Sequence, residues 1–335
     1  MATATKVFTA QTFEFRCEVA EGAPVTLNQH KGSALRGALF NSLRKVGCSR
    51  QELSSCRPCS LVEVCPVSFL LATVDEEGKR GGDVPRPFAI RPPVGSQNIF
   101  QPGDRLDWGL TLFAGSVGFL PYLIVGLQEL ERDGLGAKSE YRPGRWGRGR
   151  LRVREIIARN PLSGETQSLF EIGKKSVLPP EIPVTPDQVA ALCQGAPDTI
   201  YRLCFTFHTP MRLVAEGKPL AYPQFPVLAQ RLIERLSSLS ATFGGSELSL
   251  DFEMLMAEAC AVVEVERRVK WEAVRGYSNR QHQDLSLGGF VGEATFMGKV
   301  PNLLPLLVWG QLTHAGKDAT KGNGWYSLDS TPLAE

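Results

Sequence analysis

Residues 201–208 read YRLCFTFH, and this octapeptide decides how the second half of the chain folds. Its bulky apolar side chains occupy every second position, which is the period of a strand that buries one face. An amphipathic helix is expected after it, with one apolar face formed by Leu228, Leu232, Leu236 and Leu239. The pattern therefore predicts a strand and a helix that packs on it.

The same order of elements occurs near the start of the chain. Residues 12–19, TFEFRCEV, alternate in the same way. A helix follows, for which Asn28 is the expected N-cap and Gly47 the stop. Its apolar stripe consists of Leu35, Ala38, Leu39, Leu43 and Val46. We therefore predict a duplicated α+β unit, in which helices cover one face of each antiparallel sheet, with the boundary near residues 187–199.

The composition indicates a folded protein without a dominant charge. The 335 residues are 43% apolar, which suits two domains, and the formal net charge is only +2, so affinity for a polyanion must come from local patches. The N-terminus has no apolar block typical of a secretory signal, so we expect a cytoplasmic protein. Residues 108–128 are uncharged, but their glycines and Pro121 favour a strand, a turn and a buried helix over a membrane span.

The first basic patch, the arginine run, covers residues 142–154. It contains six arginines, three interleaved glycines and no acid. A solvated charged face is the ordinary interpretation of such a run. Glycines, however, let a backbone approach a ligand closely, and the clustered guanidinium groups repel one another unless an anion lies between them. We therefore favour phosphate binding, with these residues as the candidates: Arg142, Arg145, Arg148 and Arg150.

Two further patches combine cations with aromatic residues or glycines. Residues 267–281 hold Arg268, Arg275 and Arg280 near two aromatic side chains, which suits phosphates and stacked bases as well as it suits an exposed strand. Residues 316–324 form a glycine-rich loop between an expected helix and a last strand. The loop lacks the order of a nucleotide-binding P-loop, so we predict a cradle for a polynucleotide phosphate. Its candidate residues are Gly316, Lys317, Lys321, Gly322 and Gly324.

Four of the eight cysteines crowd into one window and form what we call the cysteine cluster: Cys48, Cys56, Cys59 and Cys65. The remaining four are scattered through apolar patterns, which favours a metal site in a reducing compartment over disulfides. The Cys-x-x-Cys pair suits two thiolates on one ion, so we predict a structural metal in an insertion at about residues 47–70. Zinc is the expected ion, a [4Fe–4S] cluster is the alternative, and unliganded thiols are the third interpretation.

Several segments together resemble the CRISPR-associated repeat-RNA-processing endoribonucleases of the RAMP superfamily. The segments that carry the resemblance are FTFHTPMRL (205–213), YSNRQ (277–281), LGGFVGEATFMG (287–298) and LLPLLVWGQLTHAGKDATKGNGWYSL (303–328), with weaker matches in HKGSALRGAL (30–39) and GRGRLRVREI (147–156). The resemblance implies two ferredoxin-like domains, at residues 1–190 and 195–330, and a glycine-rich loop that contacts RNA. The cysteine cluster is not part of the minimal family pattern, so the chain would be a cysteine-bearing member.

The resemblance also implies a reaction without a metal ion. The ribose 2′-hydroxyl attacks the adjacent phosphate, which leaves a cyclic phosphate and a 5′-hydroxyl and requires a base, an acid and cations. His30 is the first candidate, with Lys31 or Arg36 to stabilise negative charge. His314 is the second, as an acid or a phosphate ligand. The two other histidines, His208 and His282, are expected to be structural or to contact RNA.

The sequence therefore predicts an endoribonuclease that cuts CRISPR repeat transcripts into guide RNAs. The alternative is a RAMP-type subunit that holds guide RNA in an effector complex without cutting it. A third, more distant interpretation is a metal-binding protein whose arginine run contacts an acidic partner. Repeat RNA and other CRISPR effector subunits are the expected partners, and no membrane partner is expected.

Overall fold

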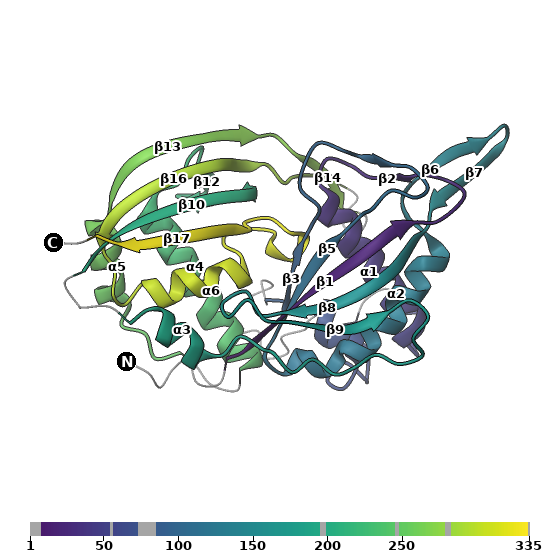
Figure 1. The fold of residues 1–335 in the computed structure, drawn as a ribbon, viewed down its shortest axis with the longest axis horizontal. Coiled ribbons are helices and arrows are strands. Elements are labelled where there is room, and N and C mark those ends of the chain that lie inside the picture. Colours follow the sequence, from purple (N-terminus) through teal and green to yellow (C-terminus); the bar gives the residue numbers. More distant parts are fainter. Residues whose placement is uncertain are drawn as a thin grey trace. The chain divides into compact units, whose positions relative to one another are not determined.

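The computed structural model describes residues 8–53, 56–72, 85–194, 199–244, 248–278 and 283–333, with only the backbone at residues 275, 277, 278 and 283–285. The described residues form two compact units (Figure 1). Gln11–Pro183 is the N-terminal unit, and Val184–Glu335 with residues 8–10 is the C-terminal unit. Arg280 and His282 lie outside the described residues.

The division after Pro183 falls N-terminal to the segment in which we expected the boundary. Helix α3 (Pro186–Leu192) lies in that segment and packs against α6 (Leu304–Thr313) of the C-terminal unit. The ring of Phe8, near the start of the chain, lies 5.2 Å from that of Trp309 in the same unit. Long-range packing thus assigns both segments to the C-terminal unit, and a local sequence pattern does not report such packing.

A five-stranded sheet forms the centre of the N-terminal unit, in the order β3-β5-β1-β8-β9. Its strands are β1 (Ala10–Val19), β3 (Phe88–Arg91), β5 (Trp108–Phe113), β8 (Leu151–Arg159) and β9 (Thr166–Glu171). The pairs β1–β8, β3–β5 and β8–β9 are antiparallel. If the strands of one β-α-β-β-α-β unit are numbered in chain order, the first four strands follow the ferredoxin-like order 4-1-3-2. Strand β9 extends this sheet beyond β8.

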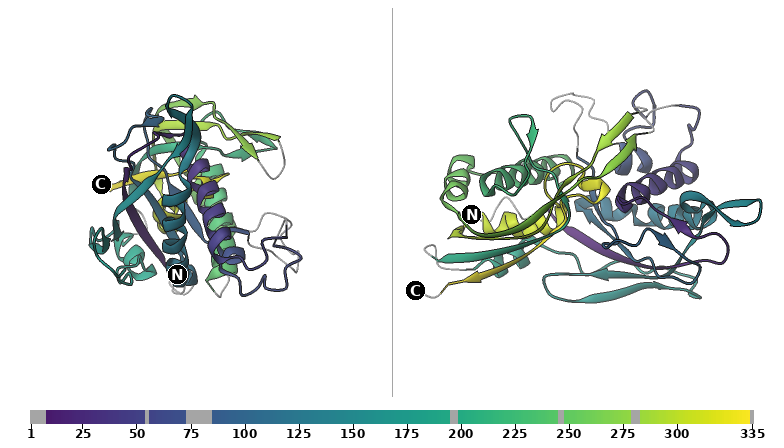
Figure 2. Two further views of the ribbon diagram at one scale, coloured as in Figure 1. Left: turned by 90° about the vertical axis from the view of Figure 1, so that its right-hand side faces the viewer. Right: turned by 90° about the horizontal axis from the view of Figure 1, so that it is seen from above.

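Two helices, α1 (Lys31–Gly47) and α2 (Leu120–Asp133), lie side by side and pack on this sheet (Figure 2). The predicted stripe of α1 is buried at Leu35, Leu39 and Leu43, whereas Val46 is 38% exposed. The helix stops at Gly47, as predicted. The predicted N-cap was wrong, because α1 is capped by His30 and not by Asn28.

A second, smaller sheet completes the N-terminal unit, in the order β4-β2-β6-β7. It consists of β2 (Val25–Thr26), β4 (Ile99–Phe100), β6 (Leu135–Arg142) and β7 (Arg145–Gly149). Strands β6 and β7 form a hairpin that extends away from the rest of the unit (Figure 1). Two short helical segments, η1 (Ser68–Ala72) and η2 (Ala114–Phe119), pack beside α1 and α2. The hairpin contains three of the six arginines of the arginine run.

The C-terminal unit repeats the same topology. Its four-stranded sheet has the order β13-β16-β10-β17, which is again 4-1-3-2. The elements are β10 (Ile200–Met211), α4 (Phe225–Phe243), α5 (Phe252–Ala261), β13 (Val263–Glu272), β16 (Gly289–Lys299), α6 and β17 (Tyr326–Pro332), with two small ribbons, β11 (Val214–Ala215) with β12 (Lys218–Pro219) and β14 (Arg275–Ser278) with β15 (Gln283–Ser286). The predicted alternation of β10 and the leucine face of α4 are both present. The fold is therefore two ferredoxin-like units, as predicted.

The uncharged run at residues 108–128 forms β5, η2 and most of α2. In the described part of the chain, no helix is both long and apolar enough to cross a membrane.

The helix α1 offers a direct test of this packing. Leu39→Ala is expected to lower the free energy of unfolding by about 2–5 kcal/mol, because it removes a buried side chain and leaves a cavity. Val46→Ala, on the same predicted stripe but exposed, is the matched control and should change it by less than about 0.5 kcal/mol. Urea denaturation followed by circular dichroism measures both. Equal losses in the two variants would contradict the packing of α1.

Candidate functional site

His30 is held at the start of α1 as the residue that caps the helix. Its Nδ1 accepts hydrogen bonds from the backbone N–H of Ser33, at 3.2 Å, and pairs with the Ser33 hydroxyl at 2.9 Å. The side chain is buried, with 6% of the residue exposed. Because Nδ1 accepts the capping bond, a neutral ring carries its proton on Nε2. Proton uptake at Nδ1 would break the cap, so base catalysis by His30 competes with the stability of α1.

The two cations expected to assist His30 are placed differently. Lys31 is buried, and its ammonium group donates to the carbonyl oxygen of Gly95 at 2.7 Å. Arg36 is half-buried and lies five residues further along α1, so the two side chains leave different sides of the helix. Lys31 thus already has a partner within its own unit.

The glycine-rich loop is a compact part of the C-terminal unit. The backbone N–H of Lys317 donates to Arg212 O at 3.1 Å, and the side-chain amide of Asn323 donates to Leu287 O at 2.9 Å. Gly324 has φ 71°, and a Cβ atom there would overlap the carbonyl oxygen of Ala315. These contacts hold the loop against the segments that follow β10 and precede β16. The loop is therefore preorganised.

Within this loop, cations and the adjacent histidine differ in accessibility. Lys317 is exposed, whereas the ammonium group of Lys321 lies 2.7 Å from Asp318 Oδ1. His314 is fully buried, and its Nδ1 lies 3.2 Å from the carbonyl oxygen of Asn323. A buried imidazole cannot reach RNA unless the loop rearranges. The geometry therefore favours a structural role for His314 and leaves Lys317 as the cation at the surface.

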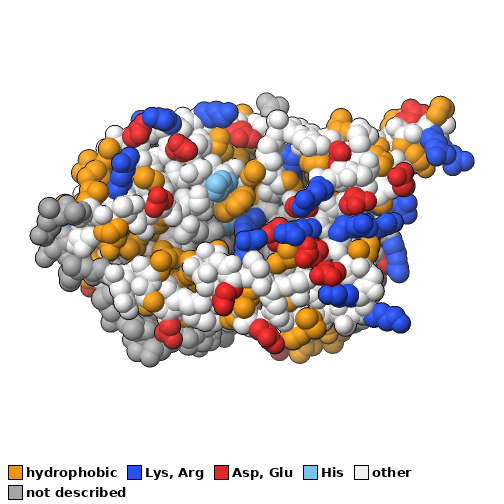
Figure 3. Space-filling model, viewed as in Figure 1, with side chains coloured by type: hydrophobic (Ala, Val, Ile, Leu, Met, Phe, Trp, Pro, Cys, Tyr) orange, Lys and Arg blue, Asp and Glu red, His pale blue; other side chains and the backbone are white. Residues whose placement is uncertain are grey.

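His208 was expected to be structural or to contact RNA. It lies on the face of β10 opposite Phe207, is half-buried, and its Nε2 is 3.0 Å from Ser327 Oγ on β17. Its ring centroid is 4.5 Å from that of Trp325. Figure 3 shows histidine atoms at the surface over β10. Among the histidines of the described ranges, only His208 is more than marginally exposed, which its sequence position on the polar side of the strand had already indicated.

The arginine run divides into three parts. Arg142, Arg145 and Arg148 are exposed on the hairpin of β6 and β7, where Figure 3 shows a group of Lys and Arg side chains. The hairpin also carries Trp146, 64% exposed, which the sequence analysis did not select although it lies among the arginines. Arg154, by contrast, lies 3.5 Å from Glu18.

Arg150 lies between these parts, next to a polar hollow. The hollow has a volume of about 480 Å³, and Arg132, Arg152 and Glu131 also line it. Arg150 donates to the carbonyl oxygen of Glu21 at 3.2 Å. Three guanidinium groups around one hollow suit an anion, although Glu131 offsets part of their charge. The expectation that the arginine run has no counter-charge was therefore wrong, because β1 and α2 supply acids.

The second patch lies on the edge strand β13. Arg268 forms an ion pair with Glu266, while Lys270 and Trp271 are exposed. Arg275 lies in β14, where only the backbone is described, and Arg280 falls outside the described residues. Lys270 and Trp271 are thus the pair on this strand with a cation and an aromatic ring at the surface.

The cysteine cluster lies in the segment between α1 and η1. All four thiols are free and partly buried. The pKa of Cys56 is raised above its ordinary value, chiefly by partial burial and to a lesser extent by the thiols of Cys65, Cys48 and Cys59. These three thiols therefore lie within electrostatic range of Cys56. Within the described residues, however, no three His, Cys, Asp or Glu side chains form a ready ligand group.

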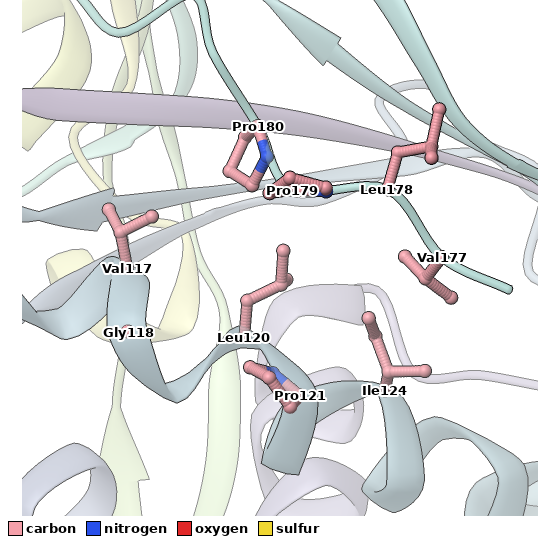
Figure 4. A pocket seen from close by; sticks show the side chains of 9 residues that line it. All are labelled: Val117, Gly118, Leu120, Pro121, Ile124, Val177, Leu178, Pro179 and Pro180. Carbon is pink, nitrogen blue, oxygen red and sulfur yellow. The ribbon is translucent and has the colours of Figure 1, made fainter.

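One apolar pocket of about 560 Å³ lies in the N-terminal unit between residues 177–180 and the start of α2 (Figure 4). Its lining consists of Val, Leu, Ile, Pro and Gly. None of these side chains can transfer a proton or bind a phosphate through charge. The pocket is therefore not a candidate reaction site.

The environment of His208 predicts its titration. Burial lowers the pKa of His208 below its ordinary value of 6.5, so the ring is neutral at pH 7. Below pH 6.5 the unfolded chain takes up a proton at this imidazole more readily than the folded protein does. His208 therefore lowers the free energy of unfolding as the pH falls below 6.5 and has no such effect above it. NMR titration of the ring protons, assigned with His208→Gln, measures the midpoint. A midpoint above 6.5 would contradict this environment.

Comparison with protein-family models gives two matches that follow the two units. Residues 8–182 match the family model AF_1859_N, described as an N-terminal domain. Residues 205–326 match the model of the CRISPR-associated endoribonuclease Cas6. The second match begins within β10 and ends at the first residue of β17, so it contains the glycine-rich loop and most of the strands of its unit.

Known proteins and structures agree with these matches. A protein of Archaeoglobus fulgidus with no stated function is 34% identical over 111 residues, which cover 33% of this chain and 37% of that protein. Cas6 of Thermus thermophilus superposes with a TM-score of 0.54 at 14% identity, covering 96% of this chain and 99% of that one.

A chain of a partial Cas6-RT-Cas1–Cas2 complex superposes with a TM-score of 0.59 at 12% identity. The match covers 97% of the present chain and 46% of the chain in that complex. The present chain thus spans less than half of that larger chain. The structural matches show the fold, and the family models identify the sequence. The chain belongs to the family of the AF_1859_N model, which matches more than half of it, and its residues 205–326 match the model of the Cas6 endoribonucleases.

Proposed function

We propose that the chain is an endoribonuclease that cuts CRISPR repeat transcripts into guide RNAs. The observation that carries the proposal is the match of residues 205–326 to the Cas6 endoribonuclease model, since these residues include both the glycine-rich loop and His208. The 2′-hydroxyl attacks the adjacent phosphate and displaces the 5′ oxygen of the next nucleotide, which leaves a cyclic phosphate and a 5′-hydroxyl. The step requires proton transfer and charge stabilisation and does not require a metal ion.

RNA binding is assigned to the exposed cations and aromatic rings. The hairpin offers three arginines around Trp146, and β13 offers Lys270 beside Trp271. Guanidinium and ammonium groups neutralise phosphates, while indole rings stack on unpaired bases. Lys317 extends this role to the glycine-rich loop, whose rigid backbone keeps the cation in place. These features support a single-stranded or loop segment of the repeat as the bound form.

Proton transfer is assigned to His208, with His30 as the competing candidate. A base for the 2′-hydroxyl must be neutral at working pH and reachable by the RNA. His208 meets both conditions, because burial lowers its pKa and its side chain is partly exposed. His30 is buried and uses Nδ1 as the helix cap, so in its capped form it offers only an Nε2 proton. This N–H group can stabilise a charged oxygen by donating a hydrogen bond to it. It cannot accept the proton of the 2′-hydroxyl.

A cleavage assay on repeat RNA in excess EDTA tests the activity. Cleavage is expected to persist in EDTA and to be lost, with binding retained, when the nucleotide before the cut is 2′-deoxy. His208→Gln should lower kcat by roughly 10²–10⁴-fold with a small effect on affinity. His30→Asn keeps a capping acceptor and removes the imidazole, so it should retain both stability and cleavage. Cleavage lost in His30→Asn and kept in His208→Gln would move the base to His30.

A non-cleaving subunit that holds guide RNA is the second candidate function. It is favoured by the burial of His30 and His314, which leaves only one partly exposed imidazole in the described residues. If the wild-type protein binds repeat RNA tightly and releases no product under any of these conditions, this function replaces the endoribonuclease. Repeat or guide RNA is the proposed partner in either case. Other CRISPR subunits in the cytoplasm are proposed as well, because one structural neighbour is described as a complex with RT, Cas1 and Cas2.

The hairpin predicts a salt-dependent contribution to RNA affinity. Changing Arg142, Arg145 and Arg148 together to Ala should weaken binding and lower the slope of log affinity against log salt by about 2, at roughly 0.7 per lost phosphate contact. Arg154→Ala is the matched control from the same run, and its ion pair with Glu18 predicts an unchanged slope. Fluorescence anisotropy across a salt series measures both. An unchanged slope in the triple variant would exclude the hairpin from RNA binding.

A further inference from the structure

The segment that joins α1 to η1 has structure without a core of its own. Of the described residues 48–53 and 56–66, none is fully buried. Val64 is 75% exposed and Leu61 is 42% exposed, so its apolar residues do not form a cluster. The backbone nevertheless turns repeatedly, with hydrogen bonds from Cys59 N to Cys56 O and from Val62 N to Cys59 O, both at 3.1 Å. Hydrophobic burial therefore does not account for its conformation.

The two ends of the segment meet at the surface of the N-terminal core. A Cβ atom on Gly47 would lie 3.3 Å from Val67 Cγ2, so the chain returns to the point that it left. Cys48 and Cys65, one at each end, are partly buried against the hydrophobic core of this unit. Two of the four thiols are thus held at the base of the segment by packing.

The other two thiols lie in the turn between these ends. Cys56 and Cys59 are half-buried, whereas their charged neighbours in the segment, Arg50, Glu52, Arg57 and Glu63, are exposed. All four cysteines are thus partly buried, as are Leu53 and Val62 of the same segment. Four cysteines on one short segment supply the thiolates that a single metal ion requires.

We propose that the cysteine cluster binds a single zinc ion through four thiolates, and that the ion organises residues 48–65 at the C-terminal end of α1. Four thiolates form a closed tetrahedral site that has no open position for a substrate, so the ion is structural and takes no part in cleavage. Because the described thiols do not form a ready ligand group, binding includes closure of the segment around the ion. The proposal does not depend on the proposed ribonuclease activity.

A basic group is in place to offset the negative charge of a zinc–tetrathiolate centre. Arg44 on α1 donates from one guanidinium nitrogen to the carbonyl oxygens of Gln51 and Leu53, which ties the segment to the helix. The same side chain interacts electrostatically with Cys56, whereas Arg50 forms an ion pair with Glu52. Zinc would thus fix the last turn of α1, the helix whose first turn is capped by His30.

Metal analysis of the full-length wild-type protein, purified under reducing conditions without added metal, tests the proposal. We expect about one zinc ion per chain, released when the thiols are titrated with an organomercurial. The double variant Cys56→Ser with Cys59→Ser should lose the zinc. The matched control, Cys193→Ser with Cys260→Ser, should retain it because both residues lie outside the segment.

Limited trypsin digestion provides a second measurement that needs no variant. Removal of zinc by a chelator should accelerate cleavage after Arg50, which precedes Gln51 in this segment, by about tenfold or more, because the segment then opens. Cleavage after the exposed Arg145 of the hairpin should be unchanged. Protein without bound metal, or equal cleavage after Arg50 with and without chelator, would overturn the proposal. Iron with acid-labile sulfide on these cysteines would overturn the assignment to zinc.

Discussion

The pairing of β10 with its neighbours is the constraint on which the C-terminal unit depends. Phe207 pairs with Tyr326 on β17 and with Gly292 on β16. A slip of one residue would turn every side chain of β10 to the opposite face, which would expose its phenylalanines and bury His208. Phe205 resists such a slip through contacts with Phe225 and Phe296 at centroid distances of 6.3 and 5.8 Å. Core packing therefore positions the side chain to which we assign proton transfer.

Helix α1 shows how one element serves stability and function at opposite ends. At its start, the imidazole of His30 caps the helix, a role that Asn, Ser or Asp has in most helices. Because the cap occupies Nδ1, it limits what His30 can do in catalysis. At its end, Gly47 and Cys48 lead directly into the cysteine-bearing segment.

The arginine run shows that residues without an acidic neighbour in the sequence can have one in the folded structure. Six arginines with no acid between them predict an unbalanced patch, but β1 runs antiparallel to β8 and brings Glu18 within 3.5 Å of Arg154. The hairpin, which leaves the main sheet, presents Arg142, Arg145 and Arg148 to solvent. Arginines of the same run are thus either paired with an acid or exposed to solvent, depending on whether a neighbouring strand supplies an acidic partner.

The amino-acid pattern alone predicted the repeated order of strand and helix, the end of α1 at Gly47 and the resemblance to CRISPR-associated ribonucleases. It could do so because periodicity and local motifs depend on residues that are close in the sequence. It could not find the cap at His30 or place the boundary after Pro183. Those features depend on burial and on hydrogen bonds to residues elsewhere in the chain. The sequence pattern indicates that His208 lies on the polar side of its strand, but only the packing of the folded chain shows that His314 is fully buried.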